Sequence, residues 1–205
     1  MQTIIEFLAV ISGGMFGVLL ARRKQMDLVG VVSVAFLTAF SGGTLRDVLL
    51  DQHPLFWIEN AHYPVIVFVV AVIASLLPRL PSRLNKWLNV PDAFGMAFFS
   101  AVGTSIAIQN QTSAFVAVLF GVMAGTFGGV IGDVVCNEVP TLFRPSTPLY
   151  ATCAFVGGWT MVFCLMAQLP KDVSLWISSG VTVTLRFVAL RFNIRLSVIQ
   201  RDASG

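Results

Sequence analysis

The chain has 205 residues, of which 56% are hydrophobic and only 11% are charged. Soluble domains carry about 25% charged residues, so this composition excludes an ordinary soluble domain and indicates an integral membrane protein. The net charge is +3 at pH 7. Most of the basic residues lie in loops, where they set the membrane topology, so the positive charge does not indicate a nucleic-acid partner and we expect none.

Seven apolar segments follow one another along the chain. Crossing a bilayer as a helix takes roughly 17 to 25 residues, so the third and fourth segments look short. The loops are too short for a soluble domain, and we therefore predict an all-α integral membrane protein with seven transmembrane helices in one domain, residues 1–205. The segments are Thr3–Ala21, Leu28–Leu50, Tyr63–Leu77, Ala93–Ile108, Thr112–Val135, Leu149–Leu169 and Val173–Leu190.

Basic residues in the loops predict the direction in which the chain crosses the membrane. The first segment has no basic residues before it, unlike a signal peptide, and three follow it, which places the N-terminus outside and the C-terminus in the cytoplasm. Only Lys171 then lies in an outer loop. The ten basic residues on the cytoplasmic side are Arg22, Arg23, Lys24, Arg79, Arg83, Lys86, Arg144, Arg191, Arg195 and Arg201.

The two halves of the chain are similar at a spacing of 86 residues. The identical pairs are Gly42 and Gly128, Gly43 and Gly129, Asp47 and Asp133, Val48 and Val134, Pro54 and Pro140, and Gly17 and Gly103, while Glu6 aligns with Asp92. Each copy holds three segments, so the second copy is inverted in the membrane. We predict two inverted three-helix repeats, residues 1–80 and 87–170, and a seventh helix at 173–192, an architecture that recurs in transport proteins.

Glycines in the first segment favour close packing of helices. Gly13 and Gly17 form a GxxxG pattern, and small residues of this kind let helices approach one another in lipid. We expect these two glycines to pack against another helix, either within the chain or between subunits.

The two double glycines suggest a different role, because each precedes an aspartate by four or five positions. We predict that the helices are kinked at Gly42–Gly43 and Gly128–Gly129, which frees backbone carbonyls to line a wet path for a cation. Close packing is the alternative. The hydroxyl groups predicted to lie at the same level are those of Ser41, Thr44 and Thr126.

Four charged residues fall inside apolar segments: Arg46, Asp47, Asp133 and Arg186. A charge at the bilayer centre costs at least about 2.5 kcal/mol, so such residues usually face the interior of a bundle. One reading is structural, with Arg186 neutralising Asp47 or Asp133, or with Arg46 and Asp47 snorkelling to the surface. The other reading places the aspartates at opposite mouths of a path, where they concentrate cations.

Other chemistry has little support in the sequence. Cys136, Cys153 and Cys164 lie in or beside apolar segments without metal-ligand spacing, so we read them as small apolar residues. His53 and His62 belong to a loop, where a histidine usually has no special role. Because nucleophile and phosphate-binding motifs are absent too, we expect no enzymatic activity, no metal site and no cofactor.

The stretches "SGGTLRD", followed by "HP", and "FGGVIGDVVCNEVP" resemble the duplicated signature of a bacterial inner-membrane family. Its members were once described as glycine transporters and are now grouped with the trimeric intracellular cation (TRIC) channels. The resemblance covers nearly the whole chain and implies a homotrimer in the inner membrane, with one potassium-permeable pore per subunit along kinked helices two and five. The chain departs from the signature at Gly132, where the counterpart of Arg46 would lie.

Three functions are compatible with the sequence. The first is a monovalent-cation channel, in which Arg186 orients the acidic residues or forms an electrostatic barrier, and to which lipid molecules can bind. The second is an alternating-access transporter for a small zwitterion such as glycine, held by half-helix ends and an aspartate. The third is a trimeric scaffold, in which the charges serve assembly alone.

Overall fold

The chain is all-helical over residues 2–77, 87–145 and 147–195, the part that the computed structural model describes. Five helices are long and apolar enough to cross a membrane: α1 (Gln2–Arg23), α2 (Leu28–Leu49), α5 (Asn89–Gln109), α6 (Ala114–Val135) and α8 (Lys171–Phe192). Two apolar helices are shorter, α4 (His62–Leu76) and α7 (Ala151–Met166), and two single turns are α3 (Phe56–Glu59) and η2 (Thr141–Phe143). The prediction of an all-α membrane protein is confirmed.

The count of seven spans stays a prediction, because α4 has 15 residues and α7 has 16. The fourth predicted segment, in contrast, is longer than expected: α5 begins at Asn89 and has 21 residues. Pro91 lies in its first turn, where a proline fits because its missing N–H has no helical partner to lose. Asp92 is therefore inside the helix.

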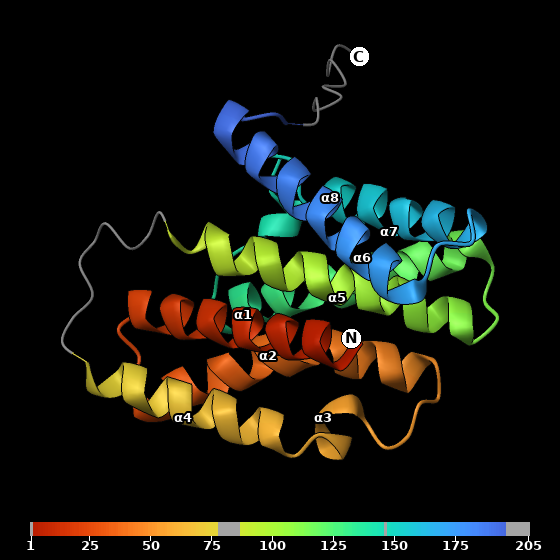
Figure 1. The fold of residues 1–205 in the computed structure, drawn as a ribbon. Coiled ribbons are helices and arrows are strands. Elements are labelled where there is room, and N and C mark those ends of the chain that lie inside the picture. Colours follow the sequence, from red (N-terminus) through yellow and green to blue (C-terminus); the bar gives the residue numbers. More distant parts are fainter. Residues whose placement is uncertain (1, 78–86, 146, 196–205) are drawn as a thin grey trace, which may run out of the picture.

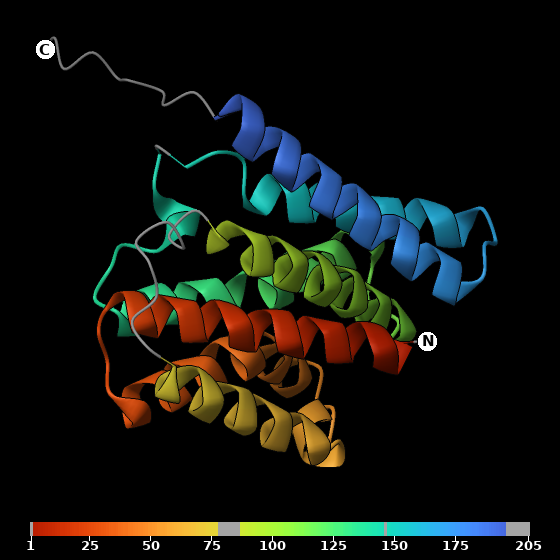
Figure 2. The same cartoon turned by 60° about the vertical axis from the view of Figure 1, so that its left-hand side comes forward.

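The helices run back and forth between two ends of one bundle (Figure 2). The end that we call the N-terminal end holds the start of α1, α3 and the turns that join α5 to α6 and α7 to α8. The C-terminal end holds the turn between α1 and α2, the connection from α6 to α7, and the end of α8. Helices α1 and α5 lie side by side and run in opposite directions (Figures 1 and 2).

The backbone repeats at the same 86-residue spacing as the sequence. The side chain of Asp27 caps α2 by accepting a hydrogen bond from Gly30 N, and Ser113 caps α6 by accepting one from Val116 N. Such caps satisfy N–H groups that have no partner within the helix. Left-handed residues recur at Gln25 and Gln111, and at Asp51 and Asn137 after the ends of α2 and α6. The turns around α2 and α6 are thus built alike, although the capping residues Asp27 and Ser113 differ.

Helices α2 and α6 cross in direct contact at one glycine from each pair. A methyl group on Gly42 would overlap the carbonyl oxygen of Ala124, and one on Gly128 would lie 2.5 Å from the carbonyl oxygen of Thr38. Both helices continue through their glycine pairs without a break. Gly42 and Gly128 therefore allow close packing of the two helices, and the kinks at the two glycine pairs stay a prediction.

Gly13 and Gly17 also pack within the chain. A Cβ atom on Gly13 would lie 3.1 Å from Ala39 Cα, and one on Gly17 would lie 2.8 Å from Ala35 Cα, both on α2. Since α2 covers this face of α1, the GxxxG pattern joins two helices of one subunit. It leaves no room there for a contact between subunits.

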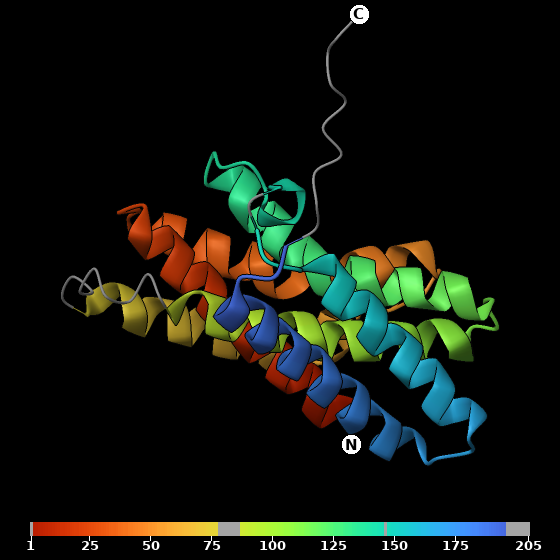
Figure 3. The same ribbon diagram turned by 90° about the horizontal axis from the view of Figure 1, so that it is seen from above.

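Helix α8 has no counterpart in the repeat and lies with α7 as an antiparallel pair beside α5 (Figure 3). Ser178 Oγ donates a hydrogen bond of 2.7 Å to the carbonyl oxygen of Gly157 on α7. Thr182 lies over the same glycine, where a Cβ atom would collide with its side chain. Small and hydroxyl-bearing residues of this kind hold helices together where lipid gives no hydrophobic driving force.

Candidate functional site

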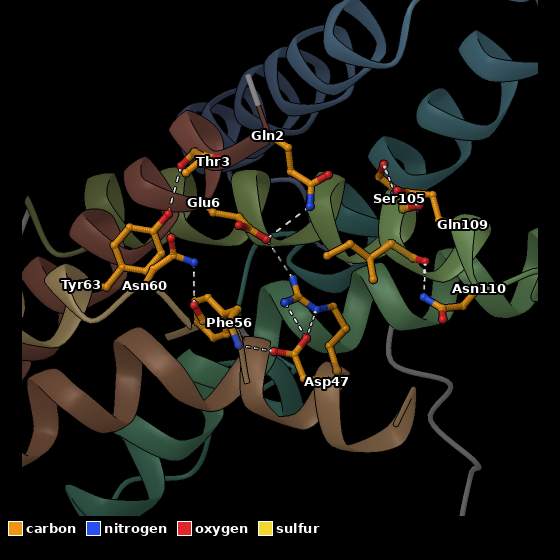
Figure 4. Close-up of polar contacts among 12 residues, drawn as sticks. Gln2, Thr3, Glu6, Asp47, Phe56, Asn60, Tyr63, Ser105, Gln109 and Asn110 are labelled. Carbon is orange, nitrogen blue, oxygen red and sulfur yellow. Dashed lines mark hydrogen bonds and ion pairs between the residues drawn. The ribbon is translucent and has the colours of Figure 1, made fainter. Parts of the chain in front are cut away.

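A buried charge cluster lies between α1 and α2 at the N-terminal end of the bundle (Figure 4). We call it the Arg46 cluster: Glu6, Arg46 and Asp47. Arg46 is 1% exposed, and its Nε and Nη2 atoms lie 2.7 and 2.6 Å from Asp47 Oδ1. Its Nη1 atom lies 3.7 Å from Glu6 Oε1 and has no hydrogen-bond partner within the described part of the chain. One reading of the sequence was that Arg46 and Asp47 snorkel to the surface. They are buried, so that reading is wrong.

The ring of Phe56 lies against this cluster. The guanidinium carbon of Arg46 is 5.4 Å from the ring centroid, a distance at which a cation is attracted to the face of an aromatic ring. Gly43 makes the arrangement possible, because a Cβ atom there would overlap the ring of Phe56. The second glycine of the pair thus admits the aromatic residue that covers the arginine.

A second cluster lies at the C-terminal end, and we call it the Arg186 cluster: Asp92, Tyr150 and Arg186. Arg186 is 1% exposed, and its Nη2 atom lies 3.9 Å from Asp92 Oδ2. The Tyr150 hydroxyl donates a hydrogen bond of 2.7 Å to Asp92 Oδ1. Arg186 stacks on the ring of Tyr150 at 4.7 Å and donates bonds of 2.9 Å from Nη1 to the carbonyl oxygens of Pro148 and Leu149.

One reading of the sequence paired Arg186 with Asp47 or Asp133, and the structure gives Arg186 a different acidic partner. Arg186 pairs with Asp92, and no ion pair joins it to Asp47 or Asp133 among the described residues. Glu6 and Asp92 align at the repeat spacing, and each faces an arginine. In the first repeat that arginine comes from α2, whereas at the equivalent position α6 has Gly132 and the arginine comes from α8.

Asp47 and Asp133 perform the same structural task at the two ends. Asp47 Oδ2 accepts a hydrogen bond of 2.9 Å from Phe56 N, the first residue of α3. Asp133 Oδ2 accepts bonds from Thr141 N and Oγ1 at 2.6 and 2.8 Å, at the start of η2. Each carboxylate anchors the short helical turn that follows its own long helix, as a charged acceptor does at a helix N-terminus.

Two adjoining cavities lie one after the other from the C-terminal end into the bundle. The wide cavity has a volume of about 270 Å³, and its lining includes Arg23, Asn89, Asp92, Asp133, Tyr150 and Arg186. The narrow cavity has about 20 Å³, which is room for roughly one water molecule. It lies between α1, α2, α5 and α6, and its lining includes Gly42 and Gly128. Phe16, Asp92 and Gly129 line both cavities, so the two meet there.

Among the described residues, the three hydroxyl groups predicted for the path, those of Ser41, Thr44 and Thr126, do not line the wide or the narrow cavity. Thr44 Oγ1 accepts a hydrogen bond of 3.0 Å from the indole of Trp57. Thr126 Oγ1 donates one of 2.8 Å to the carbonyl oxygen of Val122 in its own helix. Ser41 Oγ is buried without a partner among the described residues. Thr38, which the sequence analysis passed over, lines the narrow cavity instead.

Sequence reasoning also missed the role of Tyr150. It lies directly before α7, outside every motif. The acid pair Glu6 and Asp92 was visible at the repeat spacing, but no pattern in the sequence marks the tyrosine that binds Asp92.

Three basic side chains surround Glu138 at the mouth of the wide cavity. Lys24 Nζ lies 2.8 Å from Glu138 Oε1, Arg144 Nη2 lies 2.9 Å from Oε2, and Arg23 also pairs with Oε1. Hydrogen bonds from Lys24 and Arg144 lower the pKa of Glu138 from 4.5 to about 2. These contacts tie the connection after α6 to the end of α1.

We expect the stability that Glu138 contributes through its ion pairs to be lost in acid. Because the pKa of Glu138 is lower in the folded protein, its stabilising effect is complete above about pH 4.5 and is lost as the pH falls toward 2. Glu138→Gln should therefore lower the thermal unfolding midpoint at pH 7, and the difference from wild type should shrink below pH 4.5. Asp51→Asn, at a side chain 96% exposed, is the control, and equal midpoints for Glu138→Gln and wild type at pH 7 would contradict the expectation.

The described basic residues of the predicted cytoplasmic side lie on elements at the C-terminal end (Figure 2). Arg22, Arg23 and Lys24 end α1, Arg144 follows η2, and Arg191 and Arg195 lie at the end of α8. Lys171 starts α8 at the opposite end. Arg79, Arg83, Lys86 and Arg201 lie outside the described residues.

Comparisons with known proteins agree with this fold. The family model described as glycine transporter matches residues 3–79 and 89–166. The UPF0126 inner membrane protein YadS of Escherichia coli (strain K12) is 33% identical over 98% of this chain and 99% of its own. A UPF0126 membrane protein of Vibrio cholerae serotype O1 is 37% identical over 88% of this chain and 75% of its own.

Solved structures of TRIC cation channels have the same fold. One such channel superimposes with a TM-score of 0.86 and 29% identity, covering 98% of both chains. The TRIC trimeric intracellular cation channel orthologue from Rhodobacter sphaeroides gives a TM-score of 0.87 and 27% identity, covering 94% of this chain and 98% of that one. The resemblance to TRIC channels is confirmed, and the chain is a multi-pass membrane protein.

Proposed function

The chain belongs to the membrane-protein family described as glycine transporter, and from this membership, its likeness to TRIC cation channels and its two cavities we propose that it conducts monovalent cations. The observation that carries the proposal is the adjoining pair of cavities: the wide one is lined by carboxylates, and the narrow one lies between α1, α2, α5 and α6. The path is narrow in this conformation, so conduction requires it to widen.

The charges suit a cation path. Asp133 and Asp92 line the wide cavity, and carboxylates at a pore mouth raise the local concentration of cations. Farther in, Gly42 and Gly128 bring backbone close to the narrow cavity, where carbonyl groups can replace part of an ion's hydration shell. In this mechanism the glycines have no side chain between the backbone and the path, so the helices need no break to bring carbonyl groups close to an ion.

The remaining parts of the proposal concern assembly and topology. We propose two inverted three-helix repeats followed by a seventh span, with α4 and α7 as short spans. The subunits form a homotrimer with a pore in each, embedded in a bacterial-type inner membrane and its lipids. The N-terminal end faces outward, as the basic residues at the C-terminal end favour. Potassium is the expected ion, and no step of conduction calls for an enzyme activity or a cofactor.

A transporter for a small zwitterion is the second candidate. The wide cavity places a guanidinium, Arg186, near two carboxylates, Asp92 and Asp133, which are the charges that an amino acid such as glycine would need. The family description points the same way. Saturable uptake that depends on a substrate gradient would identify this function.

Potassium flux into proteoliposomes tests the channel directly. We expect electrogenic flux without any added metabolite, and a smaller flux for Asp133→Asn. The amide oxygen still accepts the hydrogen bond from Thr141, but the charge that attracts cations is lost. The ratio of wild-type to variant flux should be roughly twofold or more near 10 mM potassium and close to one near 1 M, because salt screens the charge.

Asp51→Asn is the matched control, since this carboxylate is fully outside the cavities and 96% exposed. Its flux should equal that of wild type at every salt concentration. Absence of potassium flux together with saturable uptake of labelled glycine would reject the channel in favour of the transporter. If the protein showed neither potassium flux nor glycine uptake, the remaining function would be the trimeric scaffold considered from the sequence.

A further inference from the structure

We propose that Thr38 determines which monovalent cations pass the narrow cavity, a role that rests on the channel function proposed above. The position 86 residues later, in the second repeat, is Ala124, which also lines this cavity. The two repeats therefore place a hydroxyl-bearing side chain and a bare methyl group at equivalent positions along the path.

The narrow cavity is poor in polar side chains. Its described lining consists of six glycines, five apolar residues, Asp92 and Thr38. Asp92 lines the wide cavity as well, so within the described part of the chain Thr38 has the one polar side chain that belongs to the narrow cavity alone. An ion that sheds water here finds few oxygen atoms to replace it, and each one has a large effect on which ion passes.

The hydroxyl oxygen of Thr38 lies among backbone oxygens. Its Oγ1 atom is 2.9 Å from the carbonyl oxygen of Gly13 on α1, which also lines the narrow cavity. It is 2.8 and 3.1 Å from the carbonyl oxygens of Val34 and Ala35 in its own helix. A hydroxyl has one hydrogen, so three acceptors compete for it and partial negative charge remains around the oxygen. Oxygen atoms of this kind can replace part of the hydration shell of a cation.

Glycines on both sides hold Thr38 in one orientation. A Cβ atom on Gly17 of α1 would overlap Thr38 Oγ1, and one on Gly132 of α6 would lie 2.7 Å from Thr38 Cγ2. The side chain is 3% exposed, with its hydroxyl directed toward α1 and its methyl group toward α6. Thr38 thus occupies the space that a side chain at position 132 would need, and its oxygen is fixed in place before an ion arrives.

Reversal potentials with potassium on one side of the bilayer and sodium on the other test this role. Thr38→Val keeps the shape of the side chain and removes the hydroxyl oxygen. Sodium holds its water more tightly than potassium, so the loss of an oxygen ligand penalises sodium more. The ratio of sodium to potassium permeability should therefore fall roughly threefold or more. Thr38→Ser keeps the hydroxyl and should keep the wild-type ratio.

Thr182→Val is the matched control. Thr182 is buried too, and its hydroxyl donates a bond of 2.9 Å to the carbonyl oxygen of Ser178, four residues earlier in the same helix. It is absent from the described lining of both cavities. Its permeability ratio should equal that of wild type.

Ala124→Ser tests the same role by adding a hydroxyl. The new oxygen lies at the equivalent position in the second repeat, so the ratio of sodium to potassium permeability should rise. This variant decides the question if Thr38→Val does not fold, because it leaves the bond between Thr38 and Gly13 intact.

The outcomes separate the role of Thr38 from the proposed function. Potassium currents with an unchanged permeability ratio in Thr38→Val, or in Ala124→Ser where Thr38→Val does not fold, would reject the role and keep the channel. A lower unfolding midpoint of Thr38→Val with an unchanged ratio would show that Thr38 only joins α1 to α2, which also rejects the role. Absence of potassium current in wild type would reject the channel itself, and the role of Thr38 with it.

Discussion

Arg46→Met is expected to destabilise the protein by about 3 to 5 kcal/mol, the typical cost of removing one partner from a buried ion pair. The reason is that Glu6 and Asp47, which are 7% and 2% exposed, would keep their charges without compensation. We expect a large fall in the thermal unfolding midpoint of the detergent-purified protein, or loss of its monodisperse fraction.

Two variants make this expectation specific. Arg23→Met removes an arginine whose side chain is 36% exposed and pairs with Glu138, so it should cost about 1 kcal/mol or less. The triple variant Glu6→Gln, Arg46→Met, Asp47→Asn removes all three charges and leaves an oxygen to accept the bond from Phe56 N, so it should recover much of the lost stability. A triple variant as unstable as Arg46→Met would show that uncompensated charge is not the cause.

The second large effect is expected at the crossing of α2 and α6. Gly42→Ala places a methyl group inside van der Waals contact of the carbonyl oxygen of Ala124, and Gly128→Ala does the same toward Thr38. Backbone atoms cannot move away as a flexible side chain can, so each variant should lose about 1 to 3 kcal/mol by overpacking. Unfolding midpoints of the two variants measure the loss.

Gly180→Ala is the matched control for these glycines, since a Cβ atom there meets nothing within 4 Å. Alanine also favours a helix over glycine by up to about 1 kcal/mol, so the control should be as stable as wild type or slightly more stable. If Gly42→Ala matched this control, the close crossing would not be a determinant of the fold.

Much of the fold follows from the hydrophobic pattern and the repeat. The predicted segments Leu28–Leu50 and Thr112–Val135 coincide with α2 and α6 within two residues, because polar caps and left-handed turn residues bound long apolar runs. The start of the fourth segment was predicted less well: it was expected at Ala93, whereas α5 begins at Asn89 and holds Pro91 in its first turn.

The candidate site was harder to predict, because the way in which the helices pack determines which charged side chains pair with one another. The repeat pairs Glu6 with Asp92 in sequence, but only the structure shows that each faces an arginine. Arg186 could not be assigned, since α8 has no repeat counterpart to fix its register against α5. Nor does the sequence tell that a double glycine lets two helices touch; at Gly42 and Gly128 the short distances to backbone oxygens of the other helix show this contact.

The different origins of the two arginines bear on how the protein is made. The Arg46 cluster and its aromatic cover lie within the first 56 residues, so the ribosome has delivered all their parts before the second repeat begins. Asp92, in contrast, enters the membrane well ahead of Arg186. Synthesis proceeds from the N-terminus, and the C-terminal end of the bundle therefore has a carboxylate without its arginine until α8 inserts. Insertion of α8 is thus the step that brings Asp92 its positive charge.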